Sequence, residues 1–296
     1  MQKLYEQYRR LLFTLAYQLT GSAADAEDAV QDVFVKVHGI DPGHLNDPKA
    51  YLCKMVTNRC LDMLSSARKR RERYFGEWLP EPVPTVRNEP LEAALLGERL
   101  SYAMLVLLER LSPAERAAFV LREALGFDYP AIAELTGKNE ANCRKLLSRA
   151  KGKLGMAPEE SPRAEAADEA WVRRLLAALG QGDAEAVVSM LAEDVVLLSD
   201  GGGKAVAAVH PIETPDRVAK FLLGLMRKLP DYIGGVRFET RPVNGQTGLL
   251  VRSKEGIDTA VLLHVDGGKI RNLYFIRNPD KLERLSGEEQ DFLKRP

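Results

Sequence analysis

The first part of the chain has the hydrophobic pattern of consecutive amphipathic helices. Apolar residues recur three or four positions apart over 4–19, and this stripe stops at Gly21. Ser22 has the residue type of a helix N-cap, so a second helix should begin directly after it. Asp47 and Pro48 suit the N-cap and first position of a third, longer helix. The first 75 residues are therefore predicted to be all-α.

A short helix, a turn and a longer helix are predicted between residues 128 and 154. Asp128 can cap the first helix, Gly137 suits a turn position with positive φ, and Asn139 can cap the second helix. Its inner stripe consists of Cys143, Leu147, Ala150 and Leu154. This pattern is typical of a helix-turn-helix, whose second helix enters the major groove of DNA.

Two stretches without periodicity divide the chain. Residues 76–90 contain four prolines, and 155–165 are rich in Pro and Glu, so both are predicted to be linkers. Helix should resume over 91–108, and Ser112 and Glu115 form a capping box for the next helix. The predicted organisation is a domain at 1–75, a linker at 76–90, a domain at 91–154, a linker at 155–165 and a domain at 166–296.

The pattern changes in the last domain from helices alone to helices followed by strands. Helices are predicted over 168–179, 184–191 and 216–228. Strands are predicted over 194–200, 205–210, 236–243, 247–253, 259–266 and 270–278, with glycine turns at 201–204, 244–245 and 266–268. Helices first and a curved antiparallel sheet afterwards predict an α+β fold behind two all-α domains.

Composition and charge change this picture little. Hydrophobic residues make up 45% of the chain, and 42 basic residues balance 42 acidic ones, so any DNA contact must come from local clusters. Cys53, Cys60 and Cys143 lack the paired spacing of a zinc site, and we expect reduced, buried thiols and no metal. Since neither a signal peptide nor a membrane span is recognisable, we expect a cytoplasmic protein that does not contact membranes.

Two local clusters of basic residues suit nucleic acid. The third helix ends in a basic run over 68–73, and the aromatic residues Tyr74, Phe75 and Trp78 follow it. Cations that track phosphates beside rings that stack on unpaired bases suit a single strand. On the second helix of the helix-turn-helix, the candidates for base edges and phosphates are Asn142, Arg144, Lys145, Ser148 and Arg149. Residue types alone are equally compatible with solvated helix faces.

The second helix has an acidic outer face. Asp25, Asp28 and Asp32 share this face, with Glu27 and Gln31 beside them. By itself such a face is typical of a helix exposed to water.

Three blocks in order resemble the extracytoplasmic-function group of bacterial sigma factors: residues 19–37 with the string DAEDAVQDVF, 47–73, and 111–154. The resemblance implies a transcription initiation factor, not an enzyme, that needs no cofactor. Its partners would be core RNA polymerase, through the beta-prime clamp and beta subunits, and promoter DNA. Polymerase binding falls by position on Asp25, Glu27, Asp28, Gln31, Asp32 and Phe34. Recognition and melting of the minus-ten element fall on Asn58, Arg59, Asp62, Arg68, Lys69, Arg70 and Arg71. The helix-turn-helix residues named above would read the minus-thirty-five element.

Three short strings extend the resemblance to sigma factors with a fused SnoaL-like domain, a cone of the nuclear-transport-factor type that controls activity in cis. The strings comprise Trp78, Leu79, Pro80, Glu81, Pro82, Asp200, Gly201, Gly202, Gly203, Lys204, Asn278, Pro279, Asp280, Lys281 and Leu282. We expect the apolar residues of the first string to need a docking surface. We expect 201–204 to form a rigid loop against the linker or the promoter-reading domains, although a plain hairpin turn also fits these residues.

Two alternative functions remain open from the residues alone. One is a one-component helix-turn-helix regulator whose cone senses a small molecule, because such cones are hollow and apolar. This ligand is therefore a further candidate partner. The other is an enzyme with a DNA-binding tail, whose candidate acids and bases are Asp194, Asp200, His210, Asp258, His264 and Asp266. Their spacing imposes no acid–base pair, so we do not expect catalysis.

Overall fold

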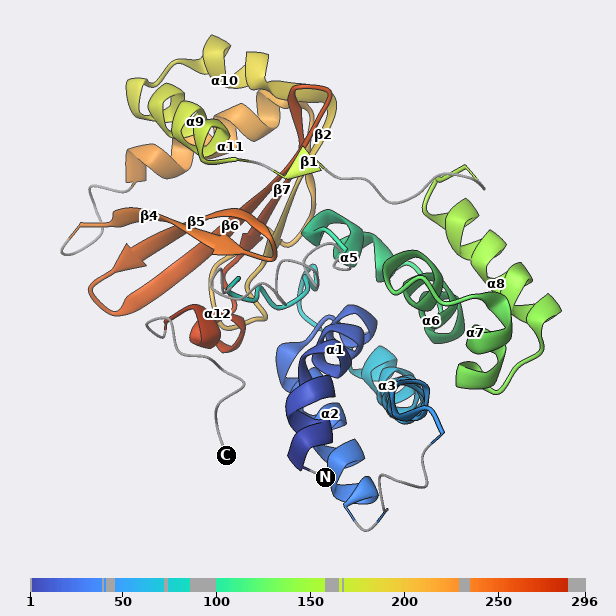
Figure 1. Cartoon of the computed structure of the whole chain (residues 1–296). Helices are drawn as coiled ribbons and strands as arrows, with labels where there is room; N and C mark the ends of the chain where they lie inside the picture. The colour runs from blue at the N-terminus through green and yellow to red at the C-terminus, as the bar shows by residue number, and fades with distance from the viewer. Residues whose placement is uncertain are drawn as a thin grey trace.

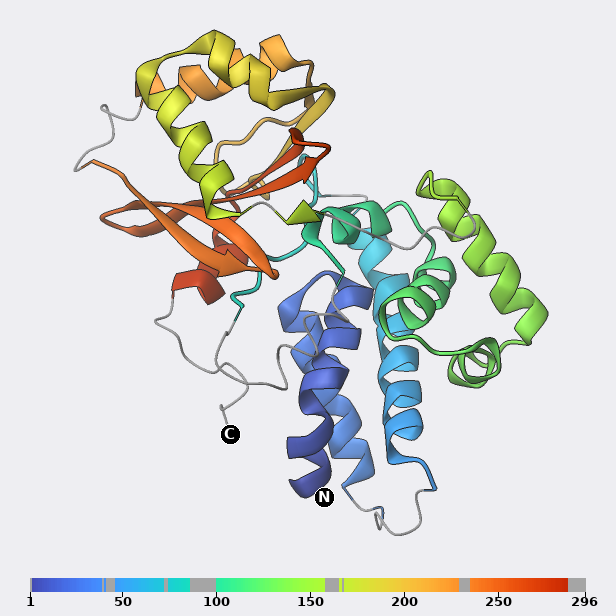
Figure 2. The ribbon, with the colours of Figure 1, turned by 45° about the horizontal axis from the view of Figure 1, so that its top comes forward.

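The computed structural model describes residues 2–38, 40, 46–71, 74–85, 100–157, 165–166, 168–228 and 235–286, and only the backbone of 66–71 and 165–166. Two groups of helices are followed by an α+β domain (Figure 1). In the first group, α1 (Gln2–Thr20), α2 (Ala23–Val37) and α3 (Pro48–Arg71) run side by side (Figure 2). Gly21 has a φ of 69°, and the Ser22 hydroxyl caps α2 by accepting from the Asp25 amide at 3.2 Å. The predicted helix starts are confirmed.

The second helical group consists of α5 (Tyr102–Leu108), α6 (Pro113–Phe119), a π-helical turn η2 (Val120–Ala124), α7 (Tyr129–Thr136) and α8 (Glu140–Lys153). The predicted continuous helix over 91–108 is wrong at its described end. Leu100 and Ser101 are not helical, and the Ser101 hydroxyl caps α5 by accepting from the Met104 amide at 3.1 Å. Residues 86–99 lie outside the described part of the chain.

Local side-chain caps fix the helix-turn-helix as predicted. The Asp128 carboxylate accepts from the Ala131 amide at 2.9 Å, and the Asn139 side chain accepts from the Asn142 amide at 2.8 Å. Gly137 ends α7 with a φ of 65°, which an L side chain rarely adopts. These caps position α8, the predicted DNA-reading helix, after a tight turn.

The α+β domain has three helices on one face of a curved sheet and one helix at the other face (Figure 1). Its helices are α9 (Glu169–Gln181), α10 (Ala184–Met190), α11 (Pro215–Lys228) and α12 (Pro279–Ser286). Its strands are β1 (Glu165–Ala166), β2 (Leu191–Asp200), β3 (Ile212–Glu213), β4 (Arg237–Val243), β5 (Gln246–Ser253), β6 (Gly256–Asp266) and β7 (Lys269–Ile276). The strand order is β3-β2-β7-β6-β5-β4, and β1 pairs with β6.

The predicted α+β class is confirmed, with three differences in detail. The sheet is mixed rather than wholly antiparallel, because β2 runs parallel to β7 with Val196 opposite Asn272. The predicted strand over 205–210 is wrong, since only Ile212 and Glu213 pair with the edge of β2. The carbonyl group of Val206 accepts from the Arg277 guanidinium instead of from a strand. The helix α12 and the short strand β1 were not predicted.

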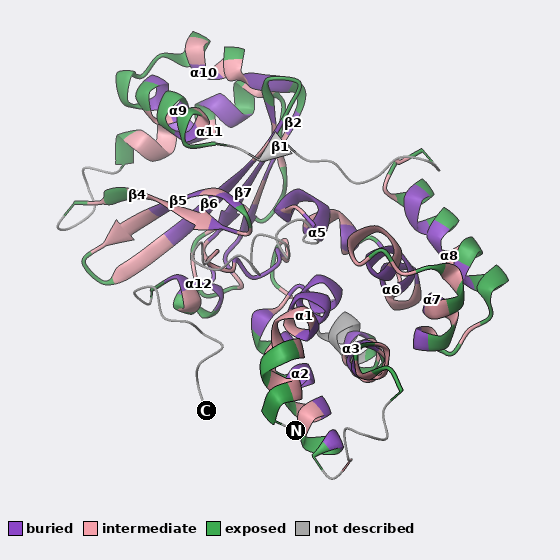
Figure 3. Cartoon of the chain, viewed as in Figure 1, coloured by how far each residue is buried: buried purple, intermediate pink, exposed green. Residues whose placement is uncertain are grey.

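Both faces of the sheet are buried, which joins the α+β domain to the helices (Figure 3). On one face, α9, α10 and α11 pack on β2, β6 and β7 around residues such as Val195 and Leu273. On the other face, Leu262, Tyr274 and Ile276 belong to the same apolar cluster as the cores of both helical groups. Tyr102 of α5 packs edge-on against Tyr274, with ring centroids 5.3 Å apart. Burial of apolar surface, about 25 cal/mol per Å², therefore stabilises this closed arrangement of the chain.

Candidate functional site

The segment from Tyr74 to Thr85, called the 74–85 segment below, is bound to the α+β domain by the last residue of β2. The Asp200 carboxylate is fully buried. It accepts hydrogen bonds from the Tyr74 hydroxyl at 2.6 Å, the Leu79 amide at 2.9 Å and the Lys281 ammonium at 2.7 Å. An isolated buried carboxylate is strongly unfavourable, so these three donors make its burial possible. With Asn278, these residues form what we call the Asp200 cluster.

Lys281 of α12 supplies the positive charge of the Asp200 cluster. Its ammonium also donates to the Leu79 carbonyl oxygen and lies 4.1 Å from the ring centroid of Trp78. The Trp78 ring and the Leu79 carbonyl group belong to the 74–85 segment, whereas both members of the Lys281–Asp200 ion pair belong to the α+β domain. Removing one partner of a buried ion pair lowers the free energy of unfolding by about 3–5 kcal/mol, so binding of the segment depends on both charges.

The glycine loop 201–204 fits beside the Asp200 cluster because Gly202 has no side chain. Gly202 has a φ of 58°, and a Cβ atom there would lie 2.3 Å from Asn278 Nδ2 and 2.8 Å from Tyr74 Oη. Asn278 Nδ2 itself donates to Tyr74 Oη at 2.8 Å. Burial and the hydrogen bond to Asp200 raise the pKa of Tyr74 above its usual range, which keeps its hydroxyl group a donor. The loop therefore lies against Tyr74 and Phe75, which directly precede the predicted linker 76–90. Its regulatory role stays a prediction.

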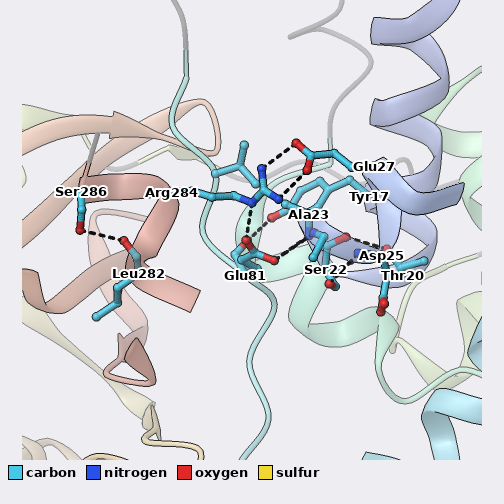
Figure 4. A network of polar contacts seen from close by, with 12 residues as sticks. Tyr17, Thr20, Ser22, Ala23, Asp25, Glu27, Glu81, Leu282, Arg284 and Ser286 are labelled. Atoms are coloured by element: carbon cyan, nitrogen blue, oxygen red, sulfur yellow. Dashed lines mark hydrogen bonds and ion pairs between the residues drawn. The ribbon is translucent and has the colours of Figure 1, made fainter. Parts of the chain in front are cut away.

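A second cluster links the same segment to α2 (Figure 4). One oxygen of the buried Glu81 carboxylate accepts from the amides of Ala23 at 2.8 Å and Ala24 at 3.4 Å, at the N-terminus of α2. The other accepts from Arg284 Nε at 2.8 Å. The two terminal nitrogens of Arg284 each donate to Glu27 at 2.7 Å. Burial raises the pKa of Glu81, and its bonds to Arg284 and α2 oppose that effect. We call Glu27, Glu81 and Arg284 the Arg284 cluster.

The end of the 74–85 segment pairs with the hairpin between β4 and β5. The Val83 amide donates to Asn244 Oδ1, and the Asn244 amide donates to the Val83 carbonyl oxygen, both at 2.9 Å. Asn244 Nδ2 donates at 2.7 Å to the hydroxyl of Tyr17 on α1, which donates at 2.6 Å to the Glu81 carbonyl oxygen. The segment is thus hydrogen-bonded to α1 and α2 on one side and to the sheet on the other.

Comparison with known proteins decides the family. The model described as Sigma-70 region 2 matches residues 4–70, and the one described as Sigma-70, region 4 matches residues 101–154. The ECF RNA polymerase sigma factor SigJ of Mycobacterium tuberculosis is 38% identical over 287 residues, which cover 94% of this chain and 91% of SigJ. The chain belongs to the extracytoplasmic-function sigma factors. It directs RNA polymerase to promoters, is not an enzyme, and is therefore neither of the two alternatives left open above.

The similarity includes the α+β domain. The crystal structure of the M. tuberculosis extracytoplasmic function sigma factor SigJ matches with a TM-score of 0.78 and 36% identity, covering 95% of this chain and 98% of that one. The probable ECF RNA polymerase sigma factor SigI of the same species is 28% identical over 96% of this chain and 95% of SigI. A curved sheet with α9, α10 and α11 on one face also agrees with the SnoaL-like resemblance.

The predicted polymerase-binding residues of this sigma factor lie on α2 in different environments. Asp28 and Gln31 are exposed, and Asp25 is half-buried. Glu27 is held by Arg284, as described above. Asp32 forms an ion pair with Arg59 at 2.7 Å. Phe34 packs edge-on against Tyr5, with ring centroids 4.9 Å apart. Their role in polymerase binding stays a prediction.

The predicted minus-ten residues lie along α3. Asn58 and Asp62 are exposed, while Arg59 is half-buried and paired with Asp32. The side chains of Arg68, Lys69, Arg70 and Arg71 lie outside the described part of the structure. The exposed residues therefore share one helix with the basic run, as the prediction of strand binding requires.

All five predicted minus-thirty-five residues are exposed or half-exposed on α8, and none contributes to its buried stripe of Cys143, Leu147 and Ala150. The Arg144 side chain already makes contacts within the protein. Its guanidinium lies 4.0 Å from the ring centroid of Tyr129 and donates a hydrogen bond to Glu140 at 3.3 Å. Lys145 and Arg149 project from the exposed face one turn apart. This arrangement is compatible with docking of α8 in a major groove.

The six acids and histidines considered for catalysis are dispersed over the α+β domain. Arg271 pairs at the surface with two of them, Asp194 and Asp266. His264 Nδ1 lies 2.9 Å from Asn272 Oδ1. The other three are the buried Asp200, the exposed loop residue His210 and the half-buried Asp258. Two cavities, of about 850 and 460 Å³, lie beside α2 and beside Trp78. The cone's small-molecule ligand stays a prediction.

Sequence reasoning missed three residues that connect distant parts of the chain. Arg284, Tyr17 and Asn244 were not singled out, although each bridges two parts of the chain. Arg284 follows Lys281 at helical spacing, so recognition of α12 as a helix would have placed both on one face. No helix among the described residues is long and apolar enough to cross a membrane, and the three cysteines are buried and form no disulfide.

Proposed function

We propose that the α+β domain controls this sigma factor in cis by holding the 74–85 segment in a closed arrangement. The observation that carries the proposal is the buried Asp200 carboxylate, which binds the backbone and a side chain of the segment at the same time. The segment leads from the helix predicted to read the minus-ten element towards the helix-turn-helix. Whatever holds it also sets the relative position of the two promoter-reading parts.

Opening of this arrangement would free the segment for an extended path between the two promoter elements. Tyr102 of α5 donates to the Pro80 carbonyl oxygen at 2.6 Å, so the second helical group is tied to the segment too. Glu81 is buried in the closed arrangement, and opening would expose its carboxylate. In this role the strings around Trp78, Asp200 and Asn278 act together as one regulatory contact.

We further infer that promoter reading by this cytoplasmic factor uses the residues predicted above. Asn142, Lys145 and Arg149 would reach base edges or phosphates from α8, and Asn58 and Asp62 would contact the minus-ten element from α3. Their exposure supports this role. Phosphate contacts would supply affinity through counterion release, whereas base contacts would supply promoter choice.

Transcription from a cognate promoter with purified core polymerase tests the control. We expect the full-length variant Asp200→Asn to give more transcript than the wild type, because a neutral side chain accepts more weakly from the Tyr74 hydroxyl and the Leu79 amide of the segment. A loss of about 1.5–3 kcal/mol would shift the closed-to-open ratio by roughly 10- to 100-fold.

The matched control is Asp194→Asn, which makes the same change on the same strand but in an exposed pair with Arg271. It should leave transcription unchanged. Equal output from Asp200→Asn, Asp194→Asn and the wild type would contradict control in cis.

A further inference from the structure

Arg284 occupies a surface of α2 that a polymerase subunit would also need. Glu27 is one of the six residues predicted to bind core polymerase, and both of its carboxylate oxygens accept from Arg284. Such a bidentate pair between a guanidinium and a carboxylate is among the stronger and most directional polar contacts. Asp28, next to Glu27 in α2, stays exposed. The contact therefore covers one end of the predicted docking face.

The position of Arg284 is itself fixed from two sides. Its Nε atom donates to Glu81, and the same Glu81 carboxylate caps the N-terminus of α2. Only 19% of the Arg284 side chain is exposed, compared with 38% for Glu27. Leu282 and Leu285, on either side of it in α12, are buried. The guanidinium group is thus held in place before any partner arrives.

The helix α12 also forms a wall of the groove that runs beside the docking face. This groove of about 850 Å³ is lined by α1, by α2 from Ala24 to Val35, by His38 directly after α2, and by Glu283 and Arg284 of α12. Phe34 and Val35 contribute apolar surface to it, and Val35 is 70% exposed. A helical element that packed its apolar side on Phe34 and Val35 and offered a cation to Glu27 would collide with α12.

We propose that α12 and core polymerase compete for this face of α2, with Arg284 taking the position that a basic side chain of polymerase takes at Glu27. The inference rests on the proposed control in cis and assigns it to the polymerase-binding step. Binding of polymerase then requires α12 to leave, and departure of α12 also removes Lys281 from the Asp200 cluster. Both clusters consequently open together.

The test is equilibrium binding of full-length sigma factor to purified core polymerase without DNA. Arg284→Gln keeps hydrogen-bonding groups but removes the charge, and we expect its affinity to rise by about 10-fold or more. Arg284→Lys keeps the charge but not the planar fork, so its rise should be smaller. Arg271→Gln is the matched control, since Arg271 pairs with two carboxylates of its own domain, and its affinity should equal that of the wild type.

Two further variants make every outcome informative. Asp28→Asn removes an exposed charge of the docking face and should lower affinity, which shows that the assay reports on α2. If Asp200→Asn raises affinity and neither Arg284 variant does, the competition is refuted while control in cis stands. If none of these variants raises affinity, the competition is refuted, and transcription by Asp200→Asn decides control in cis separately. Circular dichroism and a melting temperature close to that of the wild type identify folded variants, and Arg284→Lys serves if Arg284→Gln does not fold.

Discussion

Gly202 offers the sharpest test of the Asp200 cluster, because the adjacent Gly203 is a built-in control. Both glycines have positive φ, 58° and 71°, so an alanine at either position carries a backbone cost of about 1–2 kcal/mol. Only at Gly202 would the new Cβ atom meet the cluster, 2.3 Å from Asn278 Nδ2. At Gly203 it would lie 3.5 Å from Phe75, an ordinary contact.

The difference between the two variants isolates the contact with the 74–85 segment. In Gly202→Ala, Asn278 or Tyr74 must move, and loss of their hydrogen bond leaves a buried polar group that costs about 1–3 kcal/mol. Since 1.4 kcal/mol is about a factor of ten, opening should increase roughly 5- to 150-fold more in Gly202→Ala than in Gly203→Ala.

Hydrogen exchange at the Leu79 amide measures this opening, because that amide donates to Asp200 in the closed arrangement. Fluorescence of Trp78, which lies beneath the Lys281 ammonium, gives a second readout in a Trp171→Phe background. Equal exchange in the two alanine variants would refute the steric reasoning, as would exchange at the wild-type rate in both.

Two further predictions concern the helical groups. Burial opposes ionisation of Glu115, but hydrogen bonds from Lys153 and Ser112 outweigh it and lower the pKa of this carboxyl group below its usual 4.5. Its stabilising contribution is therefore present above pH 4.5 and is lost as the pH falls through the lowered pKa, so the melting temperatures of the wild type and Glu115→Gln should differ at neutral pH and converge in acid. Equal melting temperatures at neutral pH would contradict this assignment. Burial also raises the pKa of the Cys60 thiol to about 12, and Cys53 and Cys143 are buried as well, so a thiol reagent should label these cysteines only after unfolding. Rapid labelling of the native protein would show that its core opens.

Elements whose ends are set by neighbouring residues could be predicted from the sequence. Ser112, Asp128 and Asn139 each cap a helix three residues away, and such a contact is visible in the residue order itself. Gly137, which ends α7 at the turn of the helix-turn-helix, could be predicted from its neighbours in the same way. The α+β class followed equally from local features, since apolar runs typical of strands are separated by glycine turns at 244–245 and 266–268.

The connections between distant segments could not be predicted in the same way. Arg284 meets Glu27 across 257 positions of sequence, and no pattern along the chain encodes that pairing. Helix α12 has only eight residues, and an isolated helix of that length is not stable, so its packing on the sheet and the 74–85 segment is what forms it. The strand predicted over the alanine-rich stretch 205–210 was wrong for the opposite reason. Its apolar pattern suggested a strand, but β2 pairs with Ile212 and Glu213 instead.

The attachment of α12 to the same polypeptide as α2 has a quantitative consequence. A separate inhibitor must be made in matching amounts, and dilution or overproduction of either component changes the fraction bound. Under the proposed competition, α12 instead accompanies every α2 at an effective concentration that the fold sets, whatever the expression level. A cell can therefore raise the activity per molecule only by altering an intramolecular equilibrium, for example through modification, a ligand or the concentration of free polymerase.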